Sequence, residues 1–358
     1  MLWILGADSL VYALNKMAHG KNAVLASVAG FFADQLEHVD WAGFHFYDLI
    51  FPLFVFIVGV SIVFSLSKVV EREGKAAAHK RVFRRFVLLF VIALLYSGGF
   101  SREWPDIRLL GVLNRIALCY LFASLLFLHL RWRGLVAACV TLLVGYWALM
   151  TFVPVTGIGA GSFEKGANLA NWIDQQFLPG KKWDKTWDPE GLLSTLPAIA
   201  SCLLGAFAGL WLKRRDVDEG RKVVWLIGCG VVSVAIGALW GWQFPVIKKI
   251  WSSSFVLVAG GFSAILLGLF HLIIDVAGYR RWATPFIWIG ANAITLYLAN
   301  NLLKFREVAR RFAGGDVRNW FETHIAPGCG DMVITLIGLL LAIALAGFLY
   351  RRKIFLRV

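Results

Sequence analysis

Long apolar stretches separated by short polar connections dominate the hydrophobic pattern of the chain. A membrane-spanning helix needs about 20 mainly apolar residues, because each residue rises about 1.5 Å and the hydrocarbon layer is about 30 Å thick. By this criterion the pattern predicts about ten spans. They are residues 2–15, 48–67, 86–100, 111–129, 135–153, 191–212, 223–243, 252–275, 283–303 and 332–350. The sequence therefore predicts an all-α fold, a polytopic membrane helix bundle.

The first stretch, 2–15, is too short to cross the membrane alone. It also lacks the basic start and the small-residue cleavage site of a signal peptide. We therefore expect its helix to be truncated at the N-terminus. Because the chain shows no internal repeat, low-complexity tract or soluble segment, residues 1–358 are predicted to form a single transmembrane domain.

Lys and Arg are unevenly distributed among the connections. Twenty lie in one alternating set of 45 residues, which comprises 68–85, 131–134, 213–222, 278–282 and 351–358. Fifteen lie in the other set of 115 residues, which comprises 16–47, 101–110, 154–190, 244–251 and 304–331. Since Lys and Arg collect in cytoplasmic loops, the first set and both termini are predicted to be cytoplasmic, and the second set extracytoplasmic.

Three predicted extracytoplasmic loops are long: 16–47, 154–190 and 304–331. Within the first, apolar residues from Ala23 to Leu36 recur at helical spacing, which predicts a helix along the membrane surface.

Composition agrees with a membrane protein, because 59% of the residues are hydrophobic and 16% are charged. The chain has a net charge of +14, but its Lys and Arg residues outside the apolar segments form no basic face. This charge is better explained by anionic membrane lipid and by topology than by nucleic acid, which we exclude as a partner. The five cysteines form no C-x-x-C pair, so neither a metal site nor a disulfide framework is predicted.

Ionisable residues are concentrated at the start of the second predicted span. Such groups are expensive at membrane depth and indicate function. His38 and His45 are the nearby imidazoles, and Asp40 and Asp48 the nearby carboxylates. A His beside a carboxylate can act as a general base, which favours His38 with Asp48 as its partner. Two alternatives stay open, namely Asp48 as a helix N-cap and His45 as a packed or interfacial ring.

Other polar residues interrupt the apolar stretches. Asn114 and Arg115 lie in the fourth predicted span, Asp8 in the first and Asn292 in the ninth. The guanidinium of Arg115 suits a phosphate or carboxylate, and a structural ion pair with Asp8 or Asp48 is the alternative. Asn292 suits hydrogen bonds between helices.

Asp188-Pro189-Glu190 precedes the sixth predicted span. An Asp N-cap, a Pro at the first helical position and a Glu in the first turn are typical of a helix start. Both carboxylates are also candidates for shaping an outer vestibule.

Five stretches occur in a specific order. The first, from His38 to Gly59, reads H-x-x-W-x-G-x-x-x-x-D-L-I-F-P-x-F-V-F-I-x-G. The others are G-V-L-N-R at 111–115, D-P-E-G-L-L-S-T at 188–195, G-A-N-A-I at 290–294 and Y-R-R-K-I-F at 350–355. Together they resemble the heparan-α-glucosaminide N-acetyltransferase family and its bacterial relatives. The family's Ser-Leu-Asp-x-Phe-Arg-Gly-like start is missing, the loop before His38 is longer, and Asn114 replaces Gln.

The resemblance implies a transmembrane acyltransferase that moves an acetyl group from cytosolic acetyl-CoA to an amino sugar on the extracytoplasmic side. The family's active-site His corresponds to His38, which either accepts the acetyl group or deprotonates the acceptor amine. Asp48 would then orient His38. The candidate substrate- and acyl-CoA-binding residues are Asp8, Asn114, Arg115, Asn292, Asp188 and Glu190.

A proton-coupled secondary transporter with a His–Asp relay is the alternative function. It favours paired broken helices in two related halves, and the sequence shows no such symmetry. A non-catalytic scaffold would leave the His38–Gly59 motif unexplained. We expect a multi-pass protein of a bacterial inner membrane, without a metal, and the resemblance also implies a homodimer.

Overall fold

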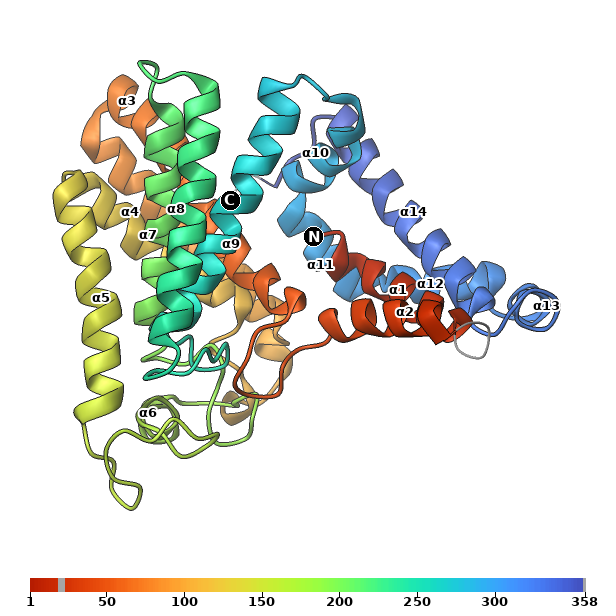
Figure 1. Cartoon of the computed structure of the whole chain (residues 1–358), viewed down its shortest axis with the longest axis horizontal. Helices are drawn as coiled ribbons and strands as arrows, with labels where there is room; N and C mark the ends of the chain where they lie inside the picture. The colour runs from red at the N-terminus through yellow and green to blue at the C-terminus, as the bar shows by residue number, and fades with distance from the viewer. Residues whose placement is uncertain (19–22, 357–358) are drawn as a thin grey trace. The chain divides into compact units, whose positions relative to one another are not determined.

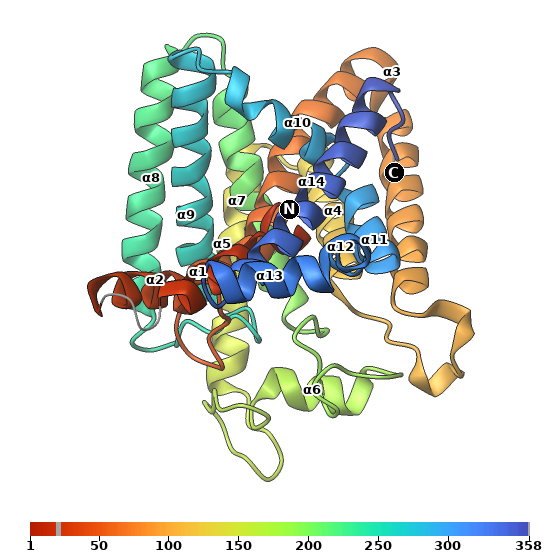
Figure 2. The same cartoon turned by 90° about the vertical axis from the view of Figure 1, so that its right-hand side faces the viewer.

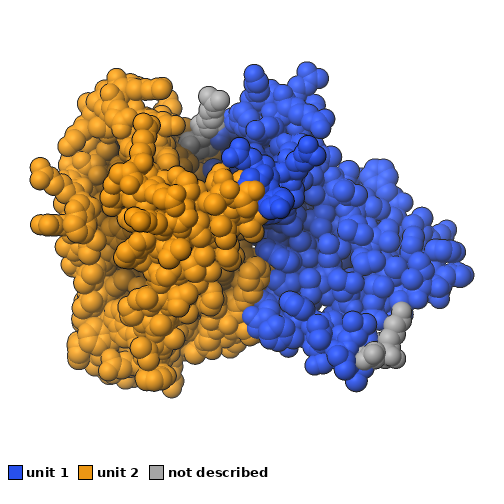
Figure 3. Space-filling view, turned by 45° about the horizontal axis from the view of Figure 1, so that its top comes forward, with its two compact units in different colours: residues 1–38, 278–358 blue, residues 39–277 orange. Residues whose placement is uncertain are grey.

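The computed structural model describes residues 1–18 and 23–356 (Figure 1). Helices are the only extended regular elements in these residues, and β-structure is limited to isolated bridges. The chain divides into two compact units, one formed by residues 1–38 and 278–358 and the other by residues 39–277 (Figure 3). The predicted all-α class is confirmed.

The unit of residues 39–277 is a bundle of long apolar helices with a short helix, α6, outside it. Its helices are η2 (Phe46–Leu49), α3 (Ile50–Tyr96), η3 (Gly99–Ser101), η4 (Trp104–Asp106), α4 (Val112–His129), α5 (Trp132–Phe152), α6 (Leu169–Phe177), α7 (Thr195–Lys213), α8 (Glu219–Trp240), α9 (Ser253–His271) and η5 (Leu272–Val276). Two views place α6 at one end of the bundle and the turn of α3 at the other end (Figure 1 and Figure 2).

Helix α3 contains two of the predicted spans, 48–67 and 86–100. It is broken at Gly74, whose φ of 83° and ψ of 173° lie outside the helical region. Glycine adopts such angles readily because it has no Cβ. The predicted connection 68–85 is therefore helical apart from this single break.

Helix α7 lies at the centre of the bundle and packs closely against α3. A Cβ built on Gly59 of α3 would lie 1.8 Å from the backbone oxygen of Cys202 in α7. One built on Gly205 of α7 would lie 1.8 Å from the backbone oxygen of Phe56 in α3. Small residues let membrane helices approach in this way. Gly59, the last residue of the His38–Gly59 motif, therefore serves helix packing.

Replacing Gly59 with Ala is expected to destabilise the protein, because the methyl group would force apart two backbones that are in contact. Overpacking of this kind costs about 1–3 kcal/mol, and more where the backbone must move. Thermal unfolding in detergent should show a lower midpoint for Gly59→Ala than for Gly145→Ala in α5. The Cβ added at Gly145 meets no atom within 4 Å. Equal midpoints would contradict the close contact of α3 and α7.

The unit of residues 1–38 and 278–358 is built around α14. Its helices are η1 (Trp3–Ala7), α1 (Asp8–Ala18), α2 (Ala23–Gln35), η6 (Arg281–Ala283), α10 (Thr284–Ala291), α11 (Ala293–Leu303), α12 (Phe305–Ala313), α13 (Asp316–His324) and α14 (Cys329–Arg351). The predicted span 283–303 is bent by 72° at Asn292, between α10 and α11. The predicted span 2–15 is divided between η1 and α1, with Gly6 outside the helical region.

Among the residues that the structure describes, seven helices are long and apolar enough to cross a membrane. The number is eight if the bent pair α10–α11 counts as one span, and α3 counts once although it holds two predicted spans. Helices α5 and α8 expose large apolar side chains along their outer faces, including Val140, Phe152, Val224 and Val232. Such surfaces are rare in water and suit lipid, and the predicted polytopic membrane bundle is confirmed.

The three long predicted loops contain helices of their own. Helix α2 confirms the helical spacing in 16–47, and it exposes Val24, Phe31 and Phe32. Its place along the membrane surface stays a prediction. Helix α6 lies within 154–190, and α12 and α13 lie within 304–331.

Candidate active site

The segment from His38 to Asp48 is held at both ends by one buried carboxylate. His38 is exposed and ends the first part of one unit, and Val39 begins the other unit. Oδ2 of Asp48 accepts the backbone N–H of Val39 at 3.3 Å and that of His45 at 3.1 Å. Asp48 therefore fixes the backbone directly adjacent to His38 in the chain.

Asp48 is also half of a buried ion pair. Its side chain is 1% exposed, and Nζ of Lys248 lies 3.1 Å from its Oδ1. Burial lowers the pKa of Lys248, while the charges of Asp48 and Glu190 act in the opposite direction. The N-cap of η2 is His45, and Asp48 completes the capping box from the third helical position. The alternative that Asp48 is itself the N-cap is thus wrong, because its carboxylate reaches back to the cap.

Arg115 lies fully buried near the start of α4. Its Nη2 donates hydrogen bonds to the carbonyl of Gly191 at 3.1 Å and to the hydroxyl of Ser194. Its guanidinium carbon is 5.0 Å from the centre of the Trp251 ring. Arg115 forms no ion pair with Asp48 in the described part of the chain, so the predicted pairing with Asp48 is wrong. The backbone before α7 captures the guanidinium instead.

Several polar atoms beside this contact have no hydrogen-bond partner among the described residues. They are Nε and Nη1 of Arg115 and both amide atoms of Asn114, which is 1% exposed. Buried polar groups are nearly always hydrogen-bonded, since leaving one unpaired costs about 1–3 kcal/mol. These donors and this acceptor therefore suit a polar ligand or water.

Asp188 and Glu190 share the guanidinium of Arg108. Its Nε and Nη2 each lie 2.7 Å from an oxygen of Asp188, and Nη2 lies 2.6 Å from Oε2 of Glu190. The backbone N–H of Gly191 donates to the carbonyl of Asp188 at 2.9 Å, which closes a turn with Pro189 at its second position. Helix α7 begins only at Thr195. The predicted helix start at Asp188 is therefore wrong, and the motif forms a turn that presents two carboxylates.

The two carboxylates differ in their electrostatic surroundings. Burial raises the pKa of Asp188, but the hydrogen bonds and charge of Arg108 outweigh it and hold that pKa below its usual range. Burial also raises the pKa of Glu190, and Arg115 and Arg108 offset this only in part. The pKa values of the two carboxyl groups are therefore shifted in opposite directions, although both groups contact Arg108.

Asp174 of α6 stabilises the turn by accepting two backbone hydrogen bonds from it. It accepts the backbone N–H of Leu192 at 2.8 Å and that of Asp188 at 3.3 Å. Burial raises the pKa of Asp174 to about 6, although these two bonds favour its charged form. A Cβ on Gly191 would lie 1.9 Å from the carboxylate of Asp174, so the turn requires glycine there.

The structure brings together five of the residues predicted from the sequence. Asp48, Asn114, Arg115, Asp188 and Glu190 all belong to the unit of residues 39–277. Glu190 connects them electrostatically, because its charge acts on both Arg115 and Lys248.

The other three predicted residues, Asp8, His38 and Asn292, belong to the unit of residues 1–38 and 278–358. Asp8 opens α1, and its Oδ1 accepts the N–H of Ser9 at 2.7 Å. Asn292 marks the bend, and its Nδ2 donates to the carbonyl of Trp288 in α10 at 3.3 Å. The predicted interhelical bond of Asn292 is not formed with any described residue.

Sequence reasoning missed Arg108, Lys248, Asp174 and Trp251. The available signal was weak: Arg108 and Lys248 are basic residues in loops that are otherwise poor in positive charge. Such residues are candidates for partners of buried carboxylates, but spacing along the chain does not identify the partner.

The opposite end of this unit carries the basic connections. His79 and His129 approach to 2.9 Å and join α3 to the end of α4. Lys213 pairs with Glu71 at 3.3 Å and joins α7 to α3 near its turn. Within this unit, the three connections predicted to be cytoplasmic, 68–85, 131–134 and 213–222, therefore gather at one end, away from Asp48 and Asp188.

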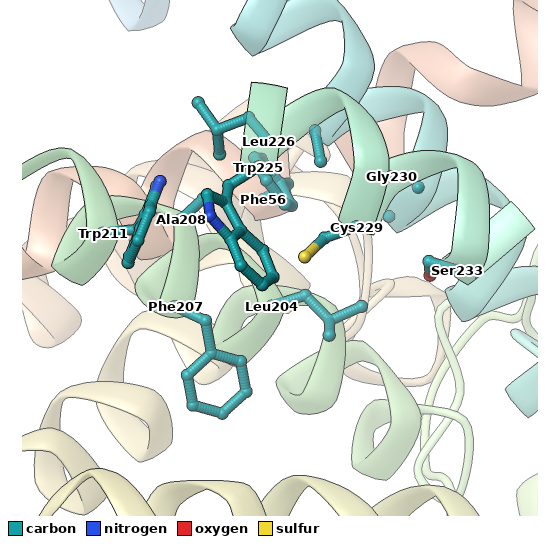
Figure 4. Close-up of a pocket in the computed structure, with 13 residues that line it drawn as sticks. Phe56, Leu204, Phe207, Ala208, Trp211, Trp225, Leu226, Cys229, Gly230 and Ser233 are labelled. Carbon is teal, nitrogen blue, oxygen red and sulfur yellow. The ribbon is translucent and has the colours of Figure 1, made fainter. Parts of the chain in front are cut away.

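An apolar pocket of about 440 Å³ lies among α3, α7, α8 and α9 (Figure 4). In the close-up, Trp211 and Trp225 stand together, and the Cys229 sulfur points toward the pocket. The lining contains no carboxylate or imidazole, so this pocket lacks the groups for acid–base chemistry. No cluster of three or more His, Cys, Asp or Glu side chains that could hold a metal occurs in residues 1–18 and 23–356.

Comparisons with a family model and with curated proteins all identify the same family. The sequence model of the family described as heparan-alpha-glucosaminide N-acetyltransferase, catalytic, matches residues 12–239. The heparan-alpha-glucosaminide N-acetyltransferase of Homo sapiens is 26% identical over 388 residues, which cover 90% of this chain and 56% of the human protein. That of Mus musculus is 24% identical over 326 residues, which cover 75% of this chain and 49% of the mouse protein. The chain spans about half the length of these curated relatives. Because the family match covers more than half of the chain, the protein belongs to the heparan-α-glucosaminide N-acetyltransferase family.

Proposed function

We propose that this protein is a membrane N-acetyltransferase that moves an acetyl group from cytosolic acetyl-CoA to an amino sugar on the extracytoplasmic side. The observation that carries the proposal is the family match over residues 12–239. This range contains the His38–Gly59 motif and the buried polar cluster of Asn114, Arg115, Asp188 and Glu190.

In the proposed reaction the acceptor amine attacks the thioester carbonyl, the carbon–sulfur bond breaks, and coenzyme A leaves as a thiolate. His38 either takes the proton of the attacking amine or accepts the acetyl group first. Asp48 acts through the backbone, because it holds the amide of Val39 next to His38. It is a positioning residue in this scheme, supported by its ion pair with Lys248.

The donor carbonyl is proposed to lie near Asn114 and Arg115. An amide N–H and a guanidinium both stabilise the negative charge that develops on a carbonyl oxygen during acyl transfer. Glu190 balances the charge of Arg115 and lies on the same turn as Asp188. Asp8 and Asn292 are also proposed as binding residues, and only the resemblance to the family supports this role.

The proposed sidedness follows from charge. The coenzyme phosphates would meet the basic connections near His79, Lys213 and the turn of α3, where Arg and Lys can hold them. Both termini are then cytoplasmic, and the turn with Asp188 is extracytoplasmic. We also propose a bacterial inner membrane as the location, with its lipid as partner, and a homodimer as the assembly.

Cysteine labelling is expected to report this orientation. In a Cys229→Ala background the remaining native thiols are buried. Cysteine at the exposed Thr156 should react with an impermeant maleimide on intact cells. Cysteine at the exposed Ala76 should react only after permeabilisation. The reverse pattern would contradict the proposed topology.

A label-transfer assay tests the function itself. Purified protein in lipid nanodiscs is given radiolabelled acetyl-CoA and a panel of amino sugars, beginning with glucosamine. We expect labelled N-acetyl sugar. The bend at Asn292 favours the transporter alternative, since discontinuous helices line transport sites. Proton-coupled sugar uptake into proteoliposomes, without transfer of label to any sugar, would replace the proposal with that alternative.

A further inference from the structure

The apolar pocket among α3, α7, α8 and α9 has no part in the proposed reaction (Figure 4). It lies wholly within the unit of residues 39–277, and its volume of about 440 Å³ is within the range of about 300–1,000 Å³ that is usual for small-molecule sites. The hydroxyl of Ser233 in its lining already donates to the carbonyl of Leu257 at 2.7 Å. A polar ligand would lose its hydrogen bonds to water and gain few in return, so the pocket suits a hydrocarbon chain.

The pocket is open beside a helix whose outer face suits lipid. Two residues of its lining on α8 are exposed: Trp225, at 58%, and Cys229. The sulfur of Cys229 points toward the pocket in the close-up (Figure 4). The neighbouring residues Val224 and Val232 of the same helix are exposed as well. A lipid chain can therefore enter the pocket from the bilayer.

Two tryptophans mark the end of the pocket that lies nearest the connection 213–222. The ring centres of Trp211 and Trp225 are 5.8 Å apart. Trp211 lies two residues before α7 ends at Lys213, and Trp225 lies six residues after α8 begins at Glu219. Tryptophan collects at the headgroup level of a membrane because its ring is amphipathic. This end of the pocket is therefore the end at which a lipid headgroup would lie.

A basic side chain continues the pocket wall toward that level. Arg221 precedes Trp225 by four residues, and Trp225 precedes Cys229 by four, so the three residues share one face of α8. With a rise of about 1.5 Å per residue, Arg221 lies about 6 Å closer to the start of the helix than Trp225. Long side chains on a helix lean toward its N-terminus, which directs the guanidinium of Arg221 away from the apolar pocket and toward the headgroup level.

The guanidinium of Arg221 is available for an anion. The connection contains three carboxylates, which are Asp216, Asp218 and Glu219. They bind Arg214, the backbone N–H groups at the start of α8, and Lys222, respectively. The side chain of Arg221 is exposed and forms no hydrogen bond or ion pair with any residue in the described ranges. A guanidinium is well matched to a phosphate group, and basic pockets between membrane helices bind anionic headgroups.

We propose that this pocket binds one acyl chain of an anionic phospholipid and that Arg221 binds the phosphate of the same lipid. The glycerol part of the lipid lies at the level of Trp211 and Trp225. The inference does not depend on the proposed acetyl transfer, because none of these residues belongs to the buried polar cluster of the candidate active site. The bound lipid fills the space between α7 and α8 and stabilises the folded bundle.

Arg221→Gln tests the headgroup contact, and Arg215→Gln is its matched control. Arg215 is also exposed and makes no side-chain contact of this kind with a described residue, but it lies outside α8. Phosphatidylglycerol is titrated into the full chain in neutral detergent, and bound lipid is counted by native mass spectrometry. For Arg221→Gln we expect the Kd of the tightest-bound phosphatidylglycerol to rise about tenfold, because a charge-assisted hydrogen bond is lost. Arg215→Gln should match the unmodified protein. An equal change in both variants would show general attraction to basic loops and would overturn the site.

Cys229→Phe tests the chain contact in the same titration, because its ring fills part of the pocket. Val232→Phe is the control, since it places the same ring on the exposed outer face of α8. We expect Cys229→Phe to weaken phosphatidylglycerol binding several-fold and Val232→Phe to leave it unchanged. The thermal midpoint of each variant without lipid reports whether it is folded. Binding to a folded Cys229→Phe variant that is as tight as to the unmodified protein would overturn the site.

Other ligands distinguish a phospholipid from the remaining occupants. Phosphatidylcholine should bind the unmodified protein more weakly than phosphatidylglycerol, and inorganic phosphate should not displace the lipid. Equal affinity for the two lipids, or displacement by phosphate alone, would overturn the proposal. Dimers that form only without lipid, and that Cys229→Phe abolishes, would assign the pocket to a second copy of the chain instead.

Discussion

His38→Ala is expected to reduce acetyl transfer by about 10²- to 10⁴-fold, which is the usual contribution of a positioned acid–base group. His38 is exposed and makes the first residue of the family-like motif, so removal of its ring should leave folding intact. The amine would then have no base to take its proton at neutral pH, and no imidazole would be present to accept the acetyl group. The measurement is initial rate with labelled acetyl-CoA and glucosamine, together with the thermal midpoint.

His45→Ala is the matched control, because its ring lies in the same segment and caps η2. Loss of such a cap costs about 1 kcal/mol, which should lower the thermal midpoint slightly and leave most of the activity. Equal rates for both variants would contradict the role of His38. Label that stays on the unmodified protein after incubation with acetyl-CoA alone, and not on His38→Ala, would identify an acetyl-His intermediate.

The lengths of the apolar stretches in the sequence predict most of the helical framework. Residues 111–129 predict a span, and α4 covers Val112–His129. Residues 332–350 predict another, and α14 covers Cys329–Arg351. These agreements follow from a general constraint, since backbone groups in lipid must be satisfied within a helix.

The breaks in the helices are harder to predict. Gly74 interrupts α3 with a positive φ, and Asn292 divides α10 from α11 with a 72° bend. Other glycines in the apolar segments, such as Gly145, remain within straight helices. The difference depends on tertiary packing and not on residue type, so hydrophobic pattern alone does not locate the turns.

The polar residues of the site were recognisable by type, but their partners were not. Asp48 and Lys248 are 200 residues apart in the chain, and Arg108 and Asp188 are 80 apart. The Asp-Pro-Glu pattern fits both a helix start and a tight turn. Arg108 stabilises the turn by hydrogen bonding to both carboxylates. Local sequence does not reveal a contact between residues so far apart in the chain.

Arg108→Ala is expected to destabilise the protein by about 3–5 kcal/mol, because it leaves two largely buried carboxylates without their cation. Arg108 is 18% exposed in its side chain, and Asp188 is fully buried. A loss of this size lowers the thermal midpoint by roughly 10 °C in a domain of 150–250 residues. The variant should recover part of its stability as the pH falls, because protonation of Asp188 and Glu190 removes the unpaired negative charge.

Arg214→Ala is the control for this variant, since Arg214 also pairs with an Asp, but on the protein surface. Exposed ion pairs contribute little, so its thermal midpoint should not change measurably. The triple variant Arg108→Ala, Asp188→Asn and Glu190→Gln should be more stable than Arg108→Ala, because neutral amides tolerate burial better than unpaired carboxylates. If Arg108→Ala and Arg214→Ala unfold at the same temperature, the turn before α7 does not depend on its buried ion pairs. In that case the orientation of Glu190 and of the carbonyl that binds Arg115 must be attributed to Asp174 and its two backbone hydrogen bonds instead.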